Sequence, residues 1–538
     1  MRQHFSRFRT LLLICVIAHG AGAPALPEAA APTVTVKSGI LEGTHFGSAG
    51  NEVAFLGVPY AEPPIGELRW RPPQPVHPWT GPRKATEFGA PCPQLRASWF
   101  PYIGWQEDCL YLNIWTPQFS RTAKLPVIVY FHGGSNIAGY SQMTPLGPGL
   151  SGLGVVVVSA NYRLGPMGFF AHSALTAESE HHSSGNYGLL DQLQALGWVR
   201  DNIAHFGGDA TRVTVMGQSA GAVDICLLMA SPMAAGLFER AIMESGDCQG
   251  TLNEDARTPI PYNSISGSGE QAGERLANDL GVADGPGALE KLRNIPADEI
   301  LKTWSQDRKV HFDALVDGWV VPEQPARIFA DGKQARVNVL VGSNADEATV
   351  FGHGGPKTVD AYKEYLLGDT GEYADQEFKA YPAMSDADVS RQYLQVQTDF
   401  FAYGAYSMAQ AMTRASQKAY LYSFTYRATG KRAQLGAYHG EELQLLSDSF
   451  PADWQHSPEE KRLGDAMRAF WTQFAKTGNP NVPGGTEWPA YNTHLDQYLA
   501  LGNTIGVRTV PAKIHVLARI MQQIFTETGN APTPSDAH

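Results

Sequence analysis

A serine between two glycines stands where two apolar segments of the sequence meet. Ser219 lies in VTVMGQSAGA, residues 213–222, with Gly217 two positions before it and Gly221 two positions after it. β-Branched residues precede the serine and small residues follow it, which predicts a strand-to-helix turn. A very sharp turn of this kind needs backbone without side chains at both flanking positions. It exposes the serine hydroxyl to a substrate, as in a nucleophile elbow.

A serine hydroxyl is a weak nucleophile, so it needs a base, a carboxylate that orients the base, and donors for the developing oxyanion. The segment FHGGS, residues 131–135, follows an apolar run and carries two adjacent glycines. Loops of this type supply oxyanion amides in lipases and esterases, together with the amide after the nucleophile. We therefore expect Gly133, Gly134 and Ala220 to form an oxyanion hole, with His132 supporting the loop.

The elements that would position these residues follow from hydrophobic patterning. Short, nearly continuous apolar runs recur at residues 127–131, 155–159, 213–216, 241–243, 337–341 and 419–424. Such runs suit strands that are covered by helices on both faces. Residues 187–206 keep helical spacing and end at two glycines. The alternation predicts an α/β fold with a mainly parallel sheet. We interpret the more polar segments 252–330 and 352–417 as helical insertions over the strand ends.

The N-terminus has the pattern of a secretory signal. Arg2, Arg7 and Arg9 precede an apolar run at residues 11–18, and small residues follow it. The run is too short to span a bilayer, which takes ~20 residues. We expect a signal peptide over residues 1–25, cleaved at about 23–32, and a secreted or periplasmic protein without a membrane anchor. One domain would then cover 33–527, and 528–538 would be a loose tail.

Composition limits the classes of function. The chain of 538 residues is 43% hydrophobic and 17% charged, which allows a large core and argues against global disorder. Its formal net charge is −12, and no basic run follows the N-terminus. Nucleic-acid binding is therefore not expected, because it needs clustered lysine and arginine. No cluster of ligand side chains indicates a metal, and the sequence leaves the oligomeric state open.

Four cysteines remain once the signal, which carries Cys15, is removed. An exported protein can form disulfides, and Cys92, Cys109, Cys226 and Cys248 allow three pairings. Cys92 and Cys109 flank a loop-like stretch and are the favoured pair; closing a loop of that length would stabilise the fold by ~3 kcal/mol in the chain-entropy model. Cys226 lies in the apolar helical run after Ser219, and we interpret it as a buried free thiol.

Motifs through most of the chain identify a family. They are FLGVPYAEPP, EDCLYLNIW, FHGGS, NYRLGPMGF, DQLQALGWVRDNIAHFGGD, GQSAGA, ESG, SNADEATVF and AYHGEEL, in this order. With them the chain resembles the type-B carboxylesterase/cholinesterase family of α/β-hydrolases. The resemblance implies the α/β-hydrolase fold, in which a large, mainly parallel central sheet carries helices on both faces and helical insertions cover the active site.

The resemblance also implies a catalytic triad in the order serine, glutamate, histidine. Ser219 matches the nucleophile, Glu347 in SNADEATVF the acid, and His439 in AYHGEEL the base. Asp346 is the alternative acid, because it stands next to Glu347, and Ala348 replaces the glycine that is usual after the acid. Cys92 and Cys109 match the family's N-terminal disulfide.

Three positions bear on the substrate pocket. Many family members carry glutamate before the nucleophile, whereas this chain has Gln218, which weakens attraction for cationic alcohols. Trp99 is a candidate for the aromatic residue on which cholinesterases seat a quaternary ammonium. Ser245 resembles a polar residue near the triad. The stretch 247–250, after ESG, lacks the bulky aromatic residue that closes the acyl pocket in cholinesterases.

These features predict a secreted serine hydrolase that cleaves carboxylic esters of small molecules through an acyl-enzyme, without metal or organic cofactor. A roomier and less anionic pocket favours bulky or acid-bearing acyl groups, such as the tricarballylate side chains of fumonisins. The alternatives are a choline-ester hydrolase and, from another class, a non-catalytic binding or adhesion protein of the same fold. Amide or thioester hydrolysis could use the same groups.

Overall fold

The computed structural model describes residues 30–47, 52–97, 101–248, 268–307, 311–351, 354–448 and 457–527. All of its strands and helices fall in the unit that begins at Pro32. The expected signal peptide and the expected tail lie outside the described residues. Within the part of the chain that is described, no helix is both long and apolar enough to cross a membrane.

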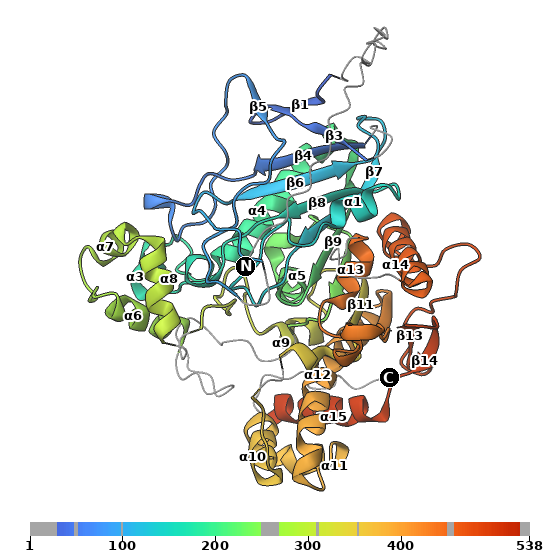
Figure 1. The fold of residues 1–538 in the computed structure, drawn as a ribbon. Coiled ribbons are helices and arrows are strands. Elements are labelled where there is room, and N and C mark those ends of the chain that lie inside the picture. Colours follow the sequence, from blue (N-terminus) through green and yellow to red (C-terminus); the bar gives the residue numbers. More distant parts are fainter. Residues whose placement is uncertain are drawn as a thin grey trace, which may run out of the picture. The chain divides into compact units, whose positions relative to one another are not determined.

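One large sheet carries the fold (Figure 1). Its spatial order is β14-β13-β12-β11-β10-β9-β7-β8-β6-β4-β3. The strands are β3 (Thr44–Phe46), β4 (Glu52–Pro59), β6 (Tyr111–Thr116), β7 (Leu125–Phe131), β8 (Val156–Ala160), β9 (Gly208–Gln218), β10 (Arg240–Glu244), β11 (Asn338–Asn344), β12 (Ala419–Phe424), β13 (Gln497–Leu501) and β14 (Gly506–Thr509). The pairs from β8 to β13 are parallel, and the pairs at both edges are antiparallel. The expectation of a mainly parallel sheet is confirmed.

A smaller sheet and the remaining helices complete the described chain. The small sheet joins β1 (Thr33–Val36), β2 (Gly39–Glu42) and β5 (Pro82–Lys84). The early helices are α1 (Leu146–Ser151), α2 (Gly165–Gly168), α3 (Ser173–Glu178), α4 (Tyr187–Asn202) and α5 (Ala220–Ala230). The later ones are α6 (Gly269–Asp279), α7 (Ala288–Asn294), α8 (Ala297–Gln306), α9 (Pro325–Ala330), α10 (Val359–Thr370), α11 (Ala374–Ala380), α12 (Asp386–Arg414), α13 (Glu441–Ser447), α14 (Pro458–Thr477) and α15 (Ala512–Glu527).

The central strands are apolar because both faces of the sheet are covered. In β7, Val127 and Val129 point into one core cluster, whereas Ile128 and Tyr130 point into the other. Alternate side chains of a strand face opposite sides, so a strand between two helical layers has no polar face. Helices α4 and α5 contribute to the first cluster, and α1, α13 and α14 to the second. This arrangement places every central strand between helices.

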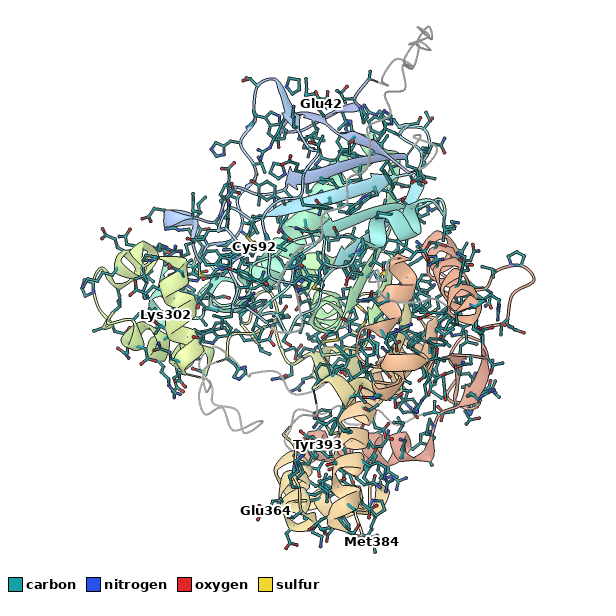
Figure 2. All side chains as sticks on the ribbon, in the orientation of Figure 1. Glu42, Cys92, Lys302, Glu364, Met384 and Tyr393 are labelled. Atoms are coloured by element: carbon teal, nitrogen blue, oxygen red, sulfur yellow. A yellow bond between two sulfur atoms is a disulfide. The ribbon has the colours of Figure 1, made fainter. Side chains whose placement is uncertain are left out.

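The polar segments between the strands form the expected helical insertions. Helices α6, α7 and α8 gather at one side of Figure 1, and α10, α11 and α15 lie together near α12. Met384, between α11 and α12, is 83% exposed and lies at the outer end of this second group (Figure 2). Helix α12 packs against β11 and against the short 3-10 helix η4 (Glu347–Val350). The second insertion therefore reaches the carboxyl end of a central strand, where sites of this fold class form.

Two disulfides are present in the described residues, one between two segments that flank a loop and one between helix α5 and the segment after β10. One links Cys92, labelled in Figure 2, to Cys109. The other links Cys226 to Cys248, so the interpretation of Cys226 as a free thiol is wrong. Its burial was anticipated correctly, but its partner follows β10, which pairs in parallel with β9. Parallel neighbours leave the sheet at the same edge, and this brings the chain after β10 against α5.

Candidate active site

Ser219 is the single residue between the end of β9 and the start of α5, and its backbone conformation is strained. Its φ is 57° and its ψ is −127°, a region that residues other than glycine rarely adopt. A Cβ atom at Gly221 would lie 2.2 Å from the Phe131 carbonyl oxygen, and one at Gly217 would lie 2.5 Å from the Gly221 carbonyl group. Neither fits, which is the physical reason for the two glycines around the serine. The turn has the geometry of a nucleophile elbow.

The loop after β7 passes directly over this turn. A Cβ atom at Gly133 would lie 2.6 Å from the Gln218 carbonyl oxygen and 2.9 Å from Ser219 Cβ. Gly134 follows with a φ of 121°, a value that favours glycine. Ala220 is the first residue of α5, where backbone N–H groups are free of helical partners. Gly133 thus lies against Ser219, Gly134 follows it in the same loop, and Ala220 follows Ser219 in the chain.

His132 supports this loop and is held neutral. It is 1% exposed, its Nδ1 lies 2.9 Å from the Gly133 carbonyl oxygen, and its ring stacks on Tyr162 with 4.5 Å between the centroids. Burial lowers the pKa of His132 to about 4. A ring that donates to its own loop and resists protonation is suited to fixing the loop rather than to accepting a proton from Ser219.

Next to the Ser219 turn and the loop after β7, the site contains a contact between His439 and Glu347. His439 Nδ1 lies 2.6 Å from Glu347 Oε2, and the other carboxylate oxygen accepts the backbone N–H of Asn344 at 2.7 Å. Glu347 follows β11 at the start of η4, and His439 lies just before α13, next to Gly440, whose φ is 82°. Because a carboxylate can only accept, Nδ1 carries the proton and Nε2 is left as the basic nitrogen.

Two opposing effects set the ionisation of His439. Burial of the ring opposes its charged form, whereas the charge of Glu347, the hydrogen bond to it and the charge of Glu442 favour that form. The net result raises the pKa of His439 above its ordinary value. An imidazole that is stabilised when charged is suited to receive a proton during a reaction.

Asp346 contacts different residues from its neighbour Glu347. Its carboxylate accepts the backbone N–H of Ala437 at 2.9 Å and the guanidinium of Arg427 at 2.9 Å. Its own N–H donates to the Ala437 carbonyl oxygen. Asp346 therefore fastens the loop that carries His439, while Glu347 faces the ring.

The structure gives Nε2 of His439 an unexpected partner. Among the described residues, its hydrogen bond is to Gln218, whose Nε2 lies 3.0 Å away; none joins it to the Ser219 hydroxyl. Gln218 is 6% exposed and is the last residue of β9. Of the other pocket candidates, Ser245 is fully buried with a φ of 55° and no partner for its hydroxyl among described residues. Trp99 lies outside the described residues.

Two phenylalanines that the sequence analysis missed enclose the imidazole. The ring of Phe351 is 4.8 Å from that of His439, and the ring of Phe401 is 5.1 Å from it. Phe351 is 51% exposed and ends the SNADEATVF motif, so its position next to the acid was a usable signal. Phe401 lies inside α12, and nothing in its local sequence relates it to a histidine on another loop.

A pair of buried carboxyl groups lies behind the histidine loop. Trp471 donates to Glu244, and the Asn344 side-chain amide donates both to Glu442 and to the Tyr438 carbonyl oxygen. Both glutamates are fully buried. Burial and then the charge of Glu347 raise the pKa of Glu442 to about 7, and burial and the charge of Glu442 raise the pKa of Glu244 well above its usual range. Two adjacent buried carboxyls favour retaining a proton at neutral pH.

The described residues contain no group of three or more histidine, cysteine, aspartate or glutamate side chains that could hold a metal ion. The chemistry available at this site is that of a hydroxyl, an imidazole, a carboxylate and backbone amides. Such a set can transfer an acyl group.

Known proteins resemble this chain in sequence and in fold. The model of the carboxylesterase family matches residues 30–516. The fumonisin B1 esterase of Sphingopyxis macrogoltabida is 36% identical over 90% of this chain and 90% of its own length. The para-nitrobenzyl esterase of Bacillus subtilis is 33% identical, over 89% of this chain and 96% of its own. A solved structure of a PNB esterase superposes with a TM-score of 0.77 at 29% identity, over 90% of this chain and 99% of its own.

Proposed function

Because the chain belongs to the carboxylesterase family of carboxylic-ester hydrolases, we propose that it cleaves esters with Ser219 as nucleophile, His439 as base and Glu347 as the acid that orients the base. The single observation that carries this assignment is the 2.6 Å contact between Glu347 and His439, from two distant segments, beside the strained turn at Ser219. No local sequence pattern produces such a contact by itself.

The proposed mechanism has two halves. Ser219 attacks the ester carbonyl while His439 Nε2 takes its proton, and Glu347 stabilises the charged ring. The amides of Gly133, Gly134 and Ala220 bind the oxyanion, and the protonated histidine gives its proton to the leaving alcohol. Water then attacks the acyl-enzyme with the same histidine as base and releases the acid.

We also propose that the enzyme is secreted or periplasmic. The support is the signal-like pattern of residues 1–25, together with two disulfides in the described part of the chain. Disulfides persist in oxidising compartments and are rare in the cytosol.

For the substrate, we propose esters with bulky or carboxylate-bearing acyl groups, of the kind found on fumonisins. Neutral Gln218 stands beside the reaction centre, and residues 247–250 contribute no bulky aromatic side chain. Both features disfavour a small cationic ester, which gains from negative charge and a closed pocket. The similarity to the fumonisin B1 esterase supports the same class. A choline-ester hydrolase is the competing substrate assignment.

The experiment that tests the function combines a label with a substrate panel. A phosphonylating reagent should modify Ser219, and Ser219→Ala should lower kcat by ~10⁶-fold, because triad residues act as a unit. Full hydrolysis by Ser219→Ala would disprove the assignment, and a wild type without turnover would support a non-catalytic binding protein. Higher kcat/KM for choline esters than for carboxylate-bearing esters would reject the proposed substrate class.

A further inference from the structure

The nitrogen of His439 that must take the Ser219 proton is already hydrogen-bonded. Glu347 fixes the ring with its proton on Nδ1, so Nε2 is an acceptor. The side-chain nitrogen of Gln218 lies 3.0 Å from Nε2, and its N–H therefore donates to that nitrogen. The ring is thus held from both sides, by a carboxylate at Nδ1 and by a neutral amide at Nε2.

Gln218 and Ser219 must compete for the same lone pair. A neutral imidazole has one lone pair on its acceptor nitrogen, and it lies in the plane of the ring. The two residues are adjacent in the chain, at the end of β9 and in the turn after it. A hydrogen bond from Gln218 in the empty site has to loosen before the Ser219 hydroxyl can give up its proton.

The surroundings make room for this amide. Two residues without side chains adjoin it: a Cβ atom at Gly133 would lie 3.1 Å from Gln218 Oε1, and one at Gly440 would lie 3.7 Å from Gln218 Nε2. Gly133 belongs to the expected oxyanion loop, and Gly440 follows His439. The amide therefore sits where the oxyanion loop, the nucleophile turn and the histidine loop meet.

We propose that Gln218 is a positioning residue that holds His439 through its Nε2 lone pair in the empty site and yields that lone pair to Ser219 when an ester binds. The role also requires that Gln218 is uncharged, because a neutral amide donates a hydrogen bond to His439 Nε2 without stabilising a proton on that nitrogen. This inference rests on the proposed function and specifies what holds the ring of the proposed base, His439, in the empty site.

The titratable and uncharged groups that face the His439 ring explain why the neutrality of Gln218 matters. Glu347 faces it from η4 and Glu442 from α13, whereas Phe351 and, from α12, Phe401 present uncharged rings. The His439 side chain is 11% exposed, so a further charge beside it would be weakly screened. A glutamate in place of Gln218 would accept from Nε2 and hold the ring in its charged, non-basic form to higher pH.

The test compares Gln218→Glu with Gln218→Met, which is of similar size but has neither charge nor donor. The measurement is kcat/KM for an uncharged p-nitrophenyl ester from pH 5 to pH 9. Gln218→Glu should move the acidic limb upward by at least one pH unit, which is a tenfold loss at pH 6 that is recovered near pH 9. Gln218→Met should move the limb by less than half as much and lower the plateau several-fold, because the ring loses its second contact.

A second measurement distinguishes a change in His439 ionisation from a general loss of structure in the variant. The rate at which a neutral phosphonylating reagent modifies Ser219 should show the same displaced limb, because it also depends on the free base. An acidic limb in Gln218→Glu that coincides with the wild type would overturn the inference, and so would equal displacements in both variants. Failure of the proposed function would look different, since hydrolysis would then persist in Ser219→Ala.

Discussion

At the scale of single residues, the site depends on positions where an extra atom does not fit. Gly133 lies against both the Gln218 carbonyl oxygen and Ser219 Cβ, at 2.6 Å and 2.9 Å from a Cβ atom placed on it. The proposed oxyanion loop can pass over the turn at Ser219 only without that atom. Close approach of two backbones, more than any side-chain contact, sets the geometry around the hydroxyl.

Replacing Gly133 with alanine should therefore displace the oxyanion amides. We expect kcat/KM for an aryl ester to fall by roughly 10²–10³-fold, the usual effect of losing one oxyanion donor. Gly197→Ala is the matched control, because a Cβ atom there meets no other atom within 4 Å and its helix gains from alanine. Unchanged kinetics in Gly133→Ala would argue against this loop as the oxyanion hole.

At the scale of elements, three connections converge at the carboxyl ends of neighbouring parallel strands. β9 leads into Ser219, β11 leads into Glu347, and the loop after β12 brings His439 to Glu347 and to Gln218, the residue before Ser219. Asp346 and Asn344 tie these connections together through hydrogen bonds to Ala437 and Tyr438. The histidine is thus positioned by the strand that carries its acid.

Asp346→Ala should loosen the loop that carries His439 without removing any reacting group. We expect kcat to fall by roughly 10- to 100-fold with little change in KM, because a displacement of about 1 Å can cost that much. Arg427→Ala is the control: it removes the other partner of Asp346, but its side chain is 67% exposed, and exposed ion pairs contribute little. If kcat fell equally in both variants, the loss would be due to the ion pair between Asp346 and Arg427 and not to the loop that carries His439.

At the scale of the whole molecule, buried charge and covalent links govern stability. Glu442 has its pKa raised from 4.5 to about 7, chiefly by burial. A carboxyl whose folded pKa is raised contributes stability below the unfolded value, and that stability is lost as pH rises through the folded value. Glu244, raised in the same direction, acts with it.

Glu442→Gln should accordingly reduce the loss of stability between about pH 5 and pH 8. The free energy of unfolding, measured by denaturant at both pH values, should fall less in this variant than in the wild type. Glu459→Gln is the control, because that carboxylate is on the surface of α14 and its pKa is lowered, so it stays ionised over this range. An unchanged pH dependence in Glu442→Gln would show that Glu442 does not hold the proton.

The two disulfides should contribute similarly to stability. They close segments with separations of 17 and 22 residues, and a loop of this size corresponds to ~3 kcal/mol in the chain-entropy model. Replacing both Cys226 and Cys248 with serine should lower the free energy of unfolding by about that amount, as should the same change at Cys92 and Cys109. No difference between oxidised wild type and the Cys226/Cys248 variant in a denaturant titration would contradict this second bond.

The sequence alone determined the class of fold and the local geometry at Ser219. Apolar runs, glycine spacing and strand-to-helix order are local properties, and they indicate buried strands and a sharp turn wherever they occur. The family motifs added which histidine and which acid to expect.

Only the tertiary structure decided which of these residues meet. The contact of Gln218 with His439, the approach of Phe401 and the pairing of Cys226 with Cys248 join segments that lie 221, 38 and 22 residues apart in the chain. Parallel strands deliver such residues to one edge of the sheet whatever their separation, and close packing then fixes their partners. The hydrophobic periodicity of the sequence does not indicate which distant residues come into contact.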